Sequence, residues 1–276
     1  MPACGNPLGG SAVETAYSPQ TPLGSGWVGR RWLRGLAWLN KCLVEAKLSF
    51  VPVDTSSAVQ DYLKGLCLLE DELVGGLEAS QVSTTTLAQR MGVSAASATN
   101  MLKRLDALGL VAYVPYQGAG LTEAGREVAL EVIRHHRLLE TYLAEALGVP
   151  WDQVHKEAEV LEHVLSEELE ERISAHLGHP SVDPHGHPIP AANLTMPPTA
   201  QTRLWDAADG AAVAIERVPD VEAEALRYMA GLGLRPGVTV EVVERGPVGG
   251  PLFVRIGGAP EVRALSKELA EDIWVA

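Results

Sequence analysis

Cysteine is scarce in this chain, and its three cysteines form no pairing motif. Cys4, Cys42 and Cys67 are odd in number, and none stands in a Cys-x-x-Cys pair. This excludes paired Cys-x-x-Cys chemistry and favours a reducing compartment, so we expect a cytoplasmic protein. The chain also lacks any run of about 18 uncharged apolar residues. We therefore expect no membrane-spanning segment.

Basic residues are few as well. The chain has 22 Lys and Arg against 35 Asp and Glu, a net charge of −13. This balance argues against general polyanion binding, because phosphate contacts need a positive surface. The charge is unevenly distributed, since residues 81–122 carry three basic and one acidic side chain, whereas residues 126–180 carry five basic and twelve acidic ones. If the first segment contacts DNA, the second must be neutralised.

The 276 residues are enough for two or three domains. Residues 1–22 are rich in Gly, Pro, Ser and Thr, a composition typical of disorder. We expect residues 1–52 to be an extension outside the folded domains. An apolar periodicity then predicts a helix over residues 55–73 that stops at Gly75-Gly76.

The next fifty residues have the pattern of a winged helix-turn-helix. Two short helices are predicted over residues 84–91 and 94–108, separated by Gly92-Val93. A strand over 110–114, a turn over 117–120 and a returning strand from Leu121 would form the wing. The second helix begins with small and polar side chains that can approach base edges and ends with two basic ones. We expect these residues to bind DNA: Ser94, Ala96, Ser97, Thr99, Asn100, Lys103 and Arg104.

Potential metal ligands concentrate between residues 154 and 163. Pro150-Trp151-Asp152 is predicted to break the chain, and a helix is predicted to follow it to about Leu177. On this helix four donors fall within about 100° of arc: His155, Glu159, Glu162 and His163. A second pair, His136 and Glu140, is spaced i, i+4 on a helix predicted over residues 123–148. Glu-rich helices are usually solvated surface. Six oxygen and nitrogen donors on two adjacent helices nevertheless indicate a divalent metal.

The last hundred residues differ in composition and in predicted secondary structure. Residues 178–198 contain His179, His185 and His187 among prolines, and we expect an ordered loop there rather than a further metal site. Beyond residue 200, strands are predicted over 212–218, 238–244, 252–256 and 274–275, with a helix over 220–231 and a turn or second helix over 260–270. These short strands predict a small β-barrel.

The order of winged helix, metal helices and small barrel resembles the diphtheria toxin repressor family of iron- and manganese-dependent regulators. The resemblance covers residues 55–276. Its most specific parts are Asp61-Tyr62-Leu63, Leu105-Asp106-x-x-Gly109-Leu110, Leu121-Thr122-x-x-Gly125, His136-Arg137-Leu138-Leu139-Glu140, Val154–His163 and Gly186-x-Pro188-Ile189-Pro190.

The resemblance implies a mainly α fold with a small β part. We expect an N-terminal winged helix-turn-helix over residues 53–125, a helical metal-binding and dimerisation domain over 126–200, and a C-terminal SH3-like (FeoA-like) β-barrel over 201–276. Because the family begins about nine residues before the position of Asp61, we also expect translation to start near Pro52. The extension would then come from a start codon assigned too far upstream.

The resemblance also implies two neighbouring metal sites. The primary site would use Asp61, Glu159, Glu162 and His163, and the second would use His136, Glu140, His155 and Glu222. The iron-responsive branch has Met and Cys at the positions of Asp61 and Glu159, whereas the manganese-responsive branch has carboxylates there. Hard oxygen ligands favour Mn(II) over softer ions, with Fe(II) as the alternative. Lys64, in contrast, stands where the manganese branch has a further acidic ligand, which argues against a two-metal cluster of that branch's type.

We therefore expect a homodimeric transcriptional regulator, a repressor of metal uptake that is activated by Mn(II) and binds double-stranded operator DNA. Without metal, repulsion among Asp61, Glu159 and Glu162 would loosen the first helix from the metal helix. Three alternatives remain: an Fe(II)-responsive regulator, a carboxylate-bridged metalloenzyme, and a protein whose barrel is a protein-interaction module and whose metals are structural. The second lacks support, because no Glu-x-x-His occurs in the metal region and His-Glu-x-x-His is absent. We assign no catalytic residues.

Overall fold

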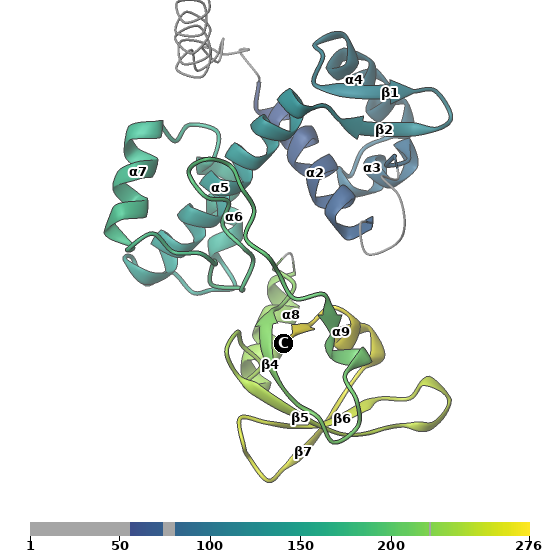
Figure 1. Cartoon of the computed structure of the whole chain (residues 1–276), viewed down its shortest axis with the longest axis vertical. Coiled ribbons are helices and arrows are strands. Elements are labelled where there is room, and N and C mark those ends of the chain that lie inside the picture. Colours follow the sequence, from purple (N-terminus) through teal and green to yellow (C-terminus); the bar gives the residue numbers. More distant parts are fainter. Residues whose placement is uncertain (1–55, 74–80, 221) are drawn as a thin grey trace, which may run out of the picture. The chain divides into compact units, whose positions relative to one another are not determined.

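The computed structural model describes residues 56–73, 81–220 and 222–276 (Figure 1). Our expectations for residues 1–52 and for a helix stop at Gly75-Gly76 lie outside these described residues. None of the described helices is long and apolar enough to cross a membrane.

The first folded part is the predicted winged helix-turn-helix. Its elements, grouped together in Figure 1, are α2 (Ser57–Leu73), α3 (Thr84–Arg90), α4 (Ala95–Ala107), β1 (Val111–Val114) and β2 (Gly118–Leu121). Serine side chains cap the N-termini of both short helices. The hydroxyl of Ser83 accepts a hydrogen bond from the backbone N–H of Thr86, and that of Ser94 accepts one from the backbone N–H of Ser97. Gly92, with φ of +62°, allows the turn between the helices.

The wing differs from the prediction in one detail. Its turn lies at residues 115–117, before the predicted turn at 117–120, and β2 already begins at Gly118. The backbone N–H of Gln117 donates to the carbonyl of Val114 and closes the turn, while Tyr116 adopts φ of +67° at its tip. The two strands pair antiparallel, with Val111 opposite Leu121.

The second part consists of α5 (Glu123–Glu145), α6 (Val154–Leu161) and α7 (Glu167–His176). The prediction of a single helix from the break at Pro150-Trp151-Asp152 to about Leu177 was wrong, because two helices occupy this range. The hydroxyl of Ser166 accepts a hydrogen bond from the N–H of Leu169 and starts a new helix there. The acidic first turn of α7 suits the positive end of its dipole. Consequently Glu162 and His163 lie in the turn after α6, not on its helical stripe.

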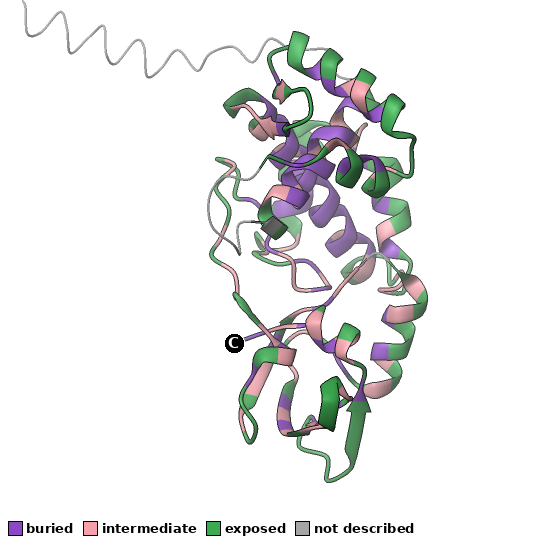
Figure 2. Cartoon of the chain, turned by 90° about the vertical axis from the view of Figure 1, so that its right-hand side faces the viewer, coloured by how far each residue is buried: buried purple, intermediate pink, exposed green. Residues whose placement is uncertain are grey.

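Helix α5 is the packing centre of this part. Every residue from Val132 to Thr141 is buried, including Arg134, His135 and Arg137, and α5 packs against α2, α6 and α7. Figure 2 shows buried helix segments in purple beside helices that carry both buried and exposed residues. Arg134 and His135 share Glu170 of α7, at 2.6 and 2.9 Å. These pairings allow charged residues to be buried within the helical layer.

The third part is the SH3-like domain. Its elements are β3 (Thr202–Arg203), β4 (Ala212–Arg217), α8 (Ala223–Leu232), β5 (Thr239–Arg245), β6 (Leu252–Ile256), β7 (Val262–Leu265), α9 (Lys267–Glu271) and β8 (Trp274–Val275). The strands form one six-stranded sheet in the order β3-β8-β4-β5-β6-β7. The predicted strands are present. The turn or helix predicted over 260–270 was incomplete, because β7 occupies its first half.

Candidate metal centre and DNA-binding surface

Three side chains from distant parts of the chain meet beside α2 and form what we call the primary group: Asp61, Glu162 and His163. Asp61 lies on α2, whereas the other two follow the end of α6. The Nε2 atom of His163 lies 3.0 Å from Oδ1 of Asp61 and 3.8 Å from Oε1 of Glu162. One donor atom from each residue lies within 4.8 Å of the others, a spacing that one divalent ion can bridge.

The surroundings of the primary group suit a metal. Nδ1–H of His163 donates to the amide oxygen of Gln60 at 2.6 Å, an arrangement that leaves Nε2 to act as the ligand atom. Burial raises the pKa of Asp61; His163 lowers that pKa in part, and Glu162 raises it further. A cation favours the ionised carboxylate, so metal and proton compete at this residue.

The buried carboxylate of Glu162 is shared between the primary group and two further side chains. Nζ of Lys64 donates to Oε1 at 3.0 Å and to Oε2 at 2.8 Å, and Nδ1 of His136 contacts Oε2. Burial alone would raise the pKa of Glu162, but His136 and Lys64 together lower it below its ordinary value. The backbone carbonyl of Glu162 faces Nδ1 of His135 at 3.2 Å, a contact that fixes the turn from behind.

A second cluster, the histidine group, contains His136, Glu140 and His155. Nε2 of His136 and Nδ1 of His155 lie 3.0 and 3.1 Å from the same oxygen, Oε1 of Glu140. Burial by itself would lower the pKa of His136, yet Glu140 and Glu162 raise it to about 9. Burial likewise opposes ionisation of Glu140, but the histidines around it hold its pKa well below the ordinary value. The structure thus brings together three of the four residues predicted for a second metal site.

A third cluster, the loop group, contains Asp183, His185, His187 and Asp220. Oδ1 of Asp183 accepts hydrogen bonds from the backbone N–H groups of His185 and His187, at 2.8 and 3.0 Å, and shapes the turn. Nδ1 of His187 lies 3.5 Å from Oδ2 of Asp183 and 3.6 Å from Oδ2 of Asp220. Nδ1 of His185 lies 3.6 Å from Oε2 of Glu140, so the loop group adjoins the histidine group.

The loop group contains the structure's clearest sign of an ion site. Among the described residues, the buried side-chain atoms without a hydrogen-bond partner are Oε2 of Glu140, Oδ2 of Asp183, Nδ1 of His185 and Nδ1 of His187. All four are atoms that can ligate a divalent ion, and buried polar atoms are otherwise nearly always paired. We had predicted only an ordered loop here. The signal that could have found the group is Asp183 two and four residues before a histidine, which lets one carboxylate hold the turn and face both rings.

Two of the predicted ligands lie apart from the groups expected to include them. The carboxylate of Glu159 is 57% exposed and lies 3.5 Å from Nε2 of His155, while the primary group comprises Asp61, Glu162 and His163. Glu222 is exposed at the start of α8. Asp220, two residues earlier, is the residue from this segment that joins the loop group, through its contact with His187.

The predicted DNA-contacting residues lie on one exposed helix. Ala98, Leu102 and Leu105 pack α4 into the core. The residues exposed on the other face are Ser94, Ala96, Ser97, Asn100, Lys103 and Arg104, with Thr99 half-buried. The hydroxyl of Thr99 donates to the carbonyl of Ala95 at 2.7 Å, so its proton is already used within the helix. A surface of small, amide and basic side chains on a capped helix suits major-groove contact.

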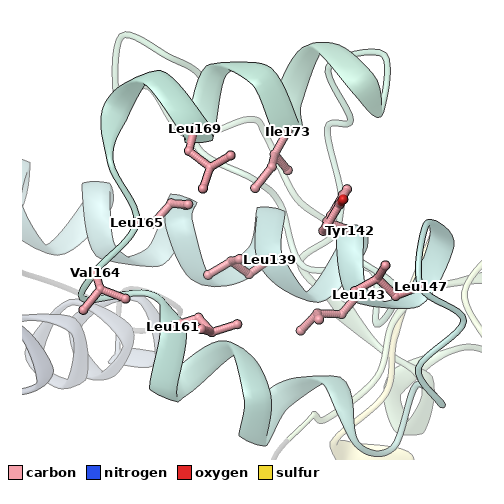
Figure 3. A pocket seen from close by; sticks show the side chains of 9 residues that line it. All are labelled: Leu139, Tyr142, Leu143, Leu147, Leu161, Val164, Leu165, Leu169 and Ile173. Atoms are coloured by element: carbon pink, nitrogen blue, oxygen red, sulfur yellow. The ribbon is translucent and has the colours of Figure 1, made fainter.

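An apolar groove lies between α5, α6 and α7. Figure 3 shows its side chains converging from the three helices, among them Leu139 and Leu143 from α5 and Ile173 from α7. The rim is strongly exposed, with Val164 at 77%, Leu147 at 61% and Leu169 at 49%. Contiguous exposed apolar surface of this kind marks an interaction site. Helical spacing from Val154 predicts that Leu161 and Leu169 pack against the core, but in the structure both are exposed on this groove.

Family models match three successive parts of the chain. Residues 54–119 match the iron dependent repressor N-terminal DNA binding domain, residues 122–191 match the iron dependent repressor metal binding and dimerisation domain, and residues 202–276 match the FeoA domain. These matches confirm the predicted fold class and the order of its parts.

Individual relatives agree with the family models. The iron-dependent repressor IdeR of Mycobacterium leprae is 31% identical over 235 residues, which are 80% of this chain and 98% of that protein. The diphtheria toxin repressor of Corynebacterium diphtheriae is 30% identical over 205 residues, 70% of this chain and 87% of that protein. These relatives are named as repressors, which confirms a regulator over a metalloenzyme.

Solved structures show the same similarity. A manganese-dependent transcriptional repressor in complex with manganese has 39% identity and a TM-score of 0.72, and covers 79% of this chain and 99% of its own. The manganese regulator SloR has 30% identity and a TM-score of 0.65, and covers 79% of this chain and 97% of its own. The chain therefore belongs to the diphtheria toxin repressor family of metal-dependent transcriptional repressors.

Proposed function

We propose that this protein is a Mn(II)-activated repressor that binds operator DNA as a homodimer. The observation that carries the proposal is the primary group, in which Asp61 of the DNA-binding part meets Glu162 and His163 of the helical part. An ion held there ties α2 to the turn after α6. Metal binding and DNA binding are then linked, and each must strengthen the other.

The donor set supports Mn(II). The primary group offers two carboxylates and one imidazole, with no sulfur ligand. Hard oxygen donors suit Mn(II) better than softer ions, and Fe(II) is the nearest competitor. We retain Glu159 as a fourth ligand, because its carboxylate adds to the charge around Asp61 and raises the pKa of that residue. Sulfur in place of either Asp61 or Glu159 would shift the preference toward softer ions.

We assign a second ion to the junction of the loop and histidine groups. Asp183, His187 and Asp220 offer three ligand atoms, and Glu140 with His185 closes the other side. The unpaired buried atoms there fit a cation. His136 and His155 already satisfy Oε1 of Glu140, so its other oxygen, Oε2, is the one left for this ion. When bound, the ion supplies charge neutralisation and holds the loop to Asp220.

The apolar groove is our candidate dimer surface, with the same face of a second copy as its partner. The family model that matches residues 122–191 is a dimerisation domain, and the groove lies within that range. A two-fold pairing of this face presents two copies of α4 to the DNA. Half-sites about one helical turn, or 34 Å, apart would suit such a dimer.

A repressor that is active when metal is abundant would suit genes for metal uptake, and it would act on the chromosome in the cytoplasm. The test begins by selecting a duplex of about 30 base pairs from a random pool with the Mn(II)-loaded protein. Fluorescence anisotropy with that duplex is then titrated with Mn(II), Fe(II) and Zn(II). Activation at the lowest free concentration of Mn(II), lost in Asp61→Ala, is the expected result. DNA affinity that is equal with and without every metal would refute the proposal.

A further inference from the structure

Lys64 lies where the primary and histidine groups meet. It is on α2, one turn after Asp61, and its side chain is only 13% exposed. Its Nζ donates to both oxygens of Glu162, at 3.0 and 2.8 Å, and lies 3.0 Å from Nδ1 of His136. A single ammonium group therefore contacts one member of each group.

This position is one that a metal ion would otherwise suit. Glu162 belongs to the primary group, while Nε2 of His136 belongs to the histidine group. The carboxylate of Glu162 is 1% exposed, and a buried carboxylate is costly unless a cation is paired with it. Lys64 is a compact cation attached to α2, so it supplies that positive charge at all metal concentrations.

We propose that Lys64 is a built-in cation that takes the place of a divalent ion between Glu162 and His136. The inference rests on the proposed function, because it concerns the ions that the protein senses. Two consequences follow from the geometry. The primary group binds one ion, because a second ion beside Glu162 would meet the ammonium group. The ammonium group also competes with that one ion for the oxygens of Glu162 and so sets the metal concentration at which the protein responds.

The experiment counts bound Mn(II) per chain by electron paramagnetic resonance, with the full-length protein and increasing metal. Lys64→Glu replaces the cation by a ligand, and we expect one additional Mn(II) per chain together with the spectrum of two exchange-coupled ions. Lys64→Met keeps the length and removes the charge, and we expect about tenfold tighter binding of the primary ion, as for one lost competing ion pair. Lys64→Arg keeps the charge and should retain the wild-type count.

Lys156→Met is the matched control, since Lys156 is an exposed lysine of α6. It should leave both the count and the affinity unchanged. A wild-type count and an uncoupled spectrum in Lys64→Glu, or an unchanged affinity in folded Lys64→Met, would overturn the inference. Neither result would affect the proposed function, which fails only if the wild-type protein shows no metal-dependent DNA binding. If Lys64→Glu does not fold without metal, the Met and Arg variants decide.

Discussion

Substitutions of Asp183 should distinguish the two roles of its carboxylate, which shapes the loop through Oδ1 and offers Oδ2 as a metal ligand. Oδ1 accepts hydrogen bonds from the N–H groups of His185 and His187, and the side chain is fully buried. Asp183→Ala leaves both donors unpaired, at about 1–3 kcal/mol each. The expected loss is about 3 kcal/mol, a large part of the 5–15 kcal/mol that typically stabilises a protein. Urea unfolding in EDTA, followed by circular dichroism, measures this loss.

Asp183→Asn is the informative partner of that variant. The amide keeps an acceptor for the two N–H groups but removes the charged Oδ2, which has no hydrogen-bond partner among the described residues and lies 3.9 Å from Nε of Arg137. We expect a loss of about 1 kcal/mol in unfolding free energy. We also expect loss of the second bound Mn(II), counted per chain by electron paramagnetic resonance. The reasoning is refuted if Asp183→Ala costs less than about 1 kcal/mol in EDTA, or if Asp183→Asn retains both ions.

Four further predictions test other parts of the assignment. Asp61→Ala should reduce Mn(II)-stimulated DNA affinity at least tenfold, measured by anisotropy, while metal-free stability changes by less than about 1 kcal/mol because Asp61 is half exposed; retained activation would contradict the primary group. Asn100→Ala should lose about 1–3 kcal/mol of discrimination at one base position. Lys103→Ala should weaken binding to all DNA sequences and lower the slope of log affinity against log salt concentration by about 1. Equal behaviour of the two variants would contradict the role of α4 in DNA recognition. Val164→Glu, which charges the exposed rim of the groove, should give monomers in sedimentation, and an intact dimer would place the interface elsewhere. Glu140 raises the pKa of His185 to about 9 despite burial. The metal-free protein should therefore lose up to about 3 kcal/mol of unfolding free energy between pH 6.5 and 9, as His185 gives up its proton. An unfolding free energy that stays constant across this pH range would argue against the ion pair of His185 with Glu140.

Much of the fold followed from local signals. The helix predicted to begin at Ser94 does so, with the Ser94 hydroxyl as its cap, and Gly92 takes the positive φ that the turn before it requires. The alternating pattern over 252–256 became a strand with buried Leu252, Val254 and Ile256. Each of these features depends on residues within one or two turns, so the chain's local pattern is sufficient.

The predictions from sequence failed where contacts between distant residues determine the structure. Helical periodicity continued through Leu165, yet Ser166 and the acids after it begin a separate helix, so Glu162 and His163 take positions that a helical wheel does not give. The loop group was missed because Asp220 lies 33 residues beyond His187, yet in the fold Oδ2 of Asp220 lies 3.6 Å from Nδ1 of His187. Spacing along the chain says little about ligands from different domains.

The surroundings of Glu162 also change the mechanism expected for coupling metal binding to the position of α2. We had predicted that three carboxylates repel one another without metal and loosen α2. Glu162 instead faces the ammonium group of Lys64 and the imidazole of His136, and Glu159 lies beside His155. Asp61 has His163 at 3.0 Å. Each carboxylate thus already has a cationic or imidazole neighbour, so little repulsion remains for a metal to relieve. An ion must therefore act by exchanging these protons and the ammonium contact for a shorter, directional link between α2 and the turn after α6.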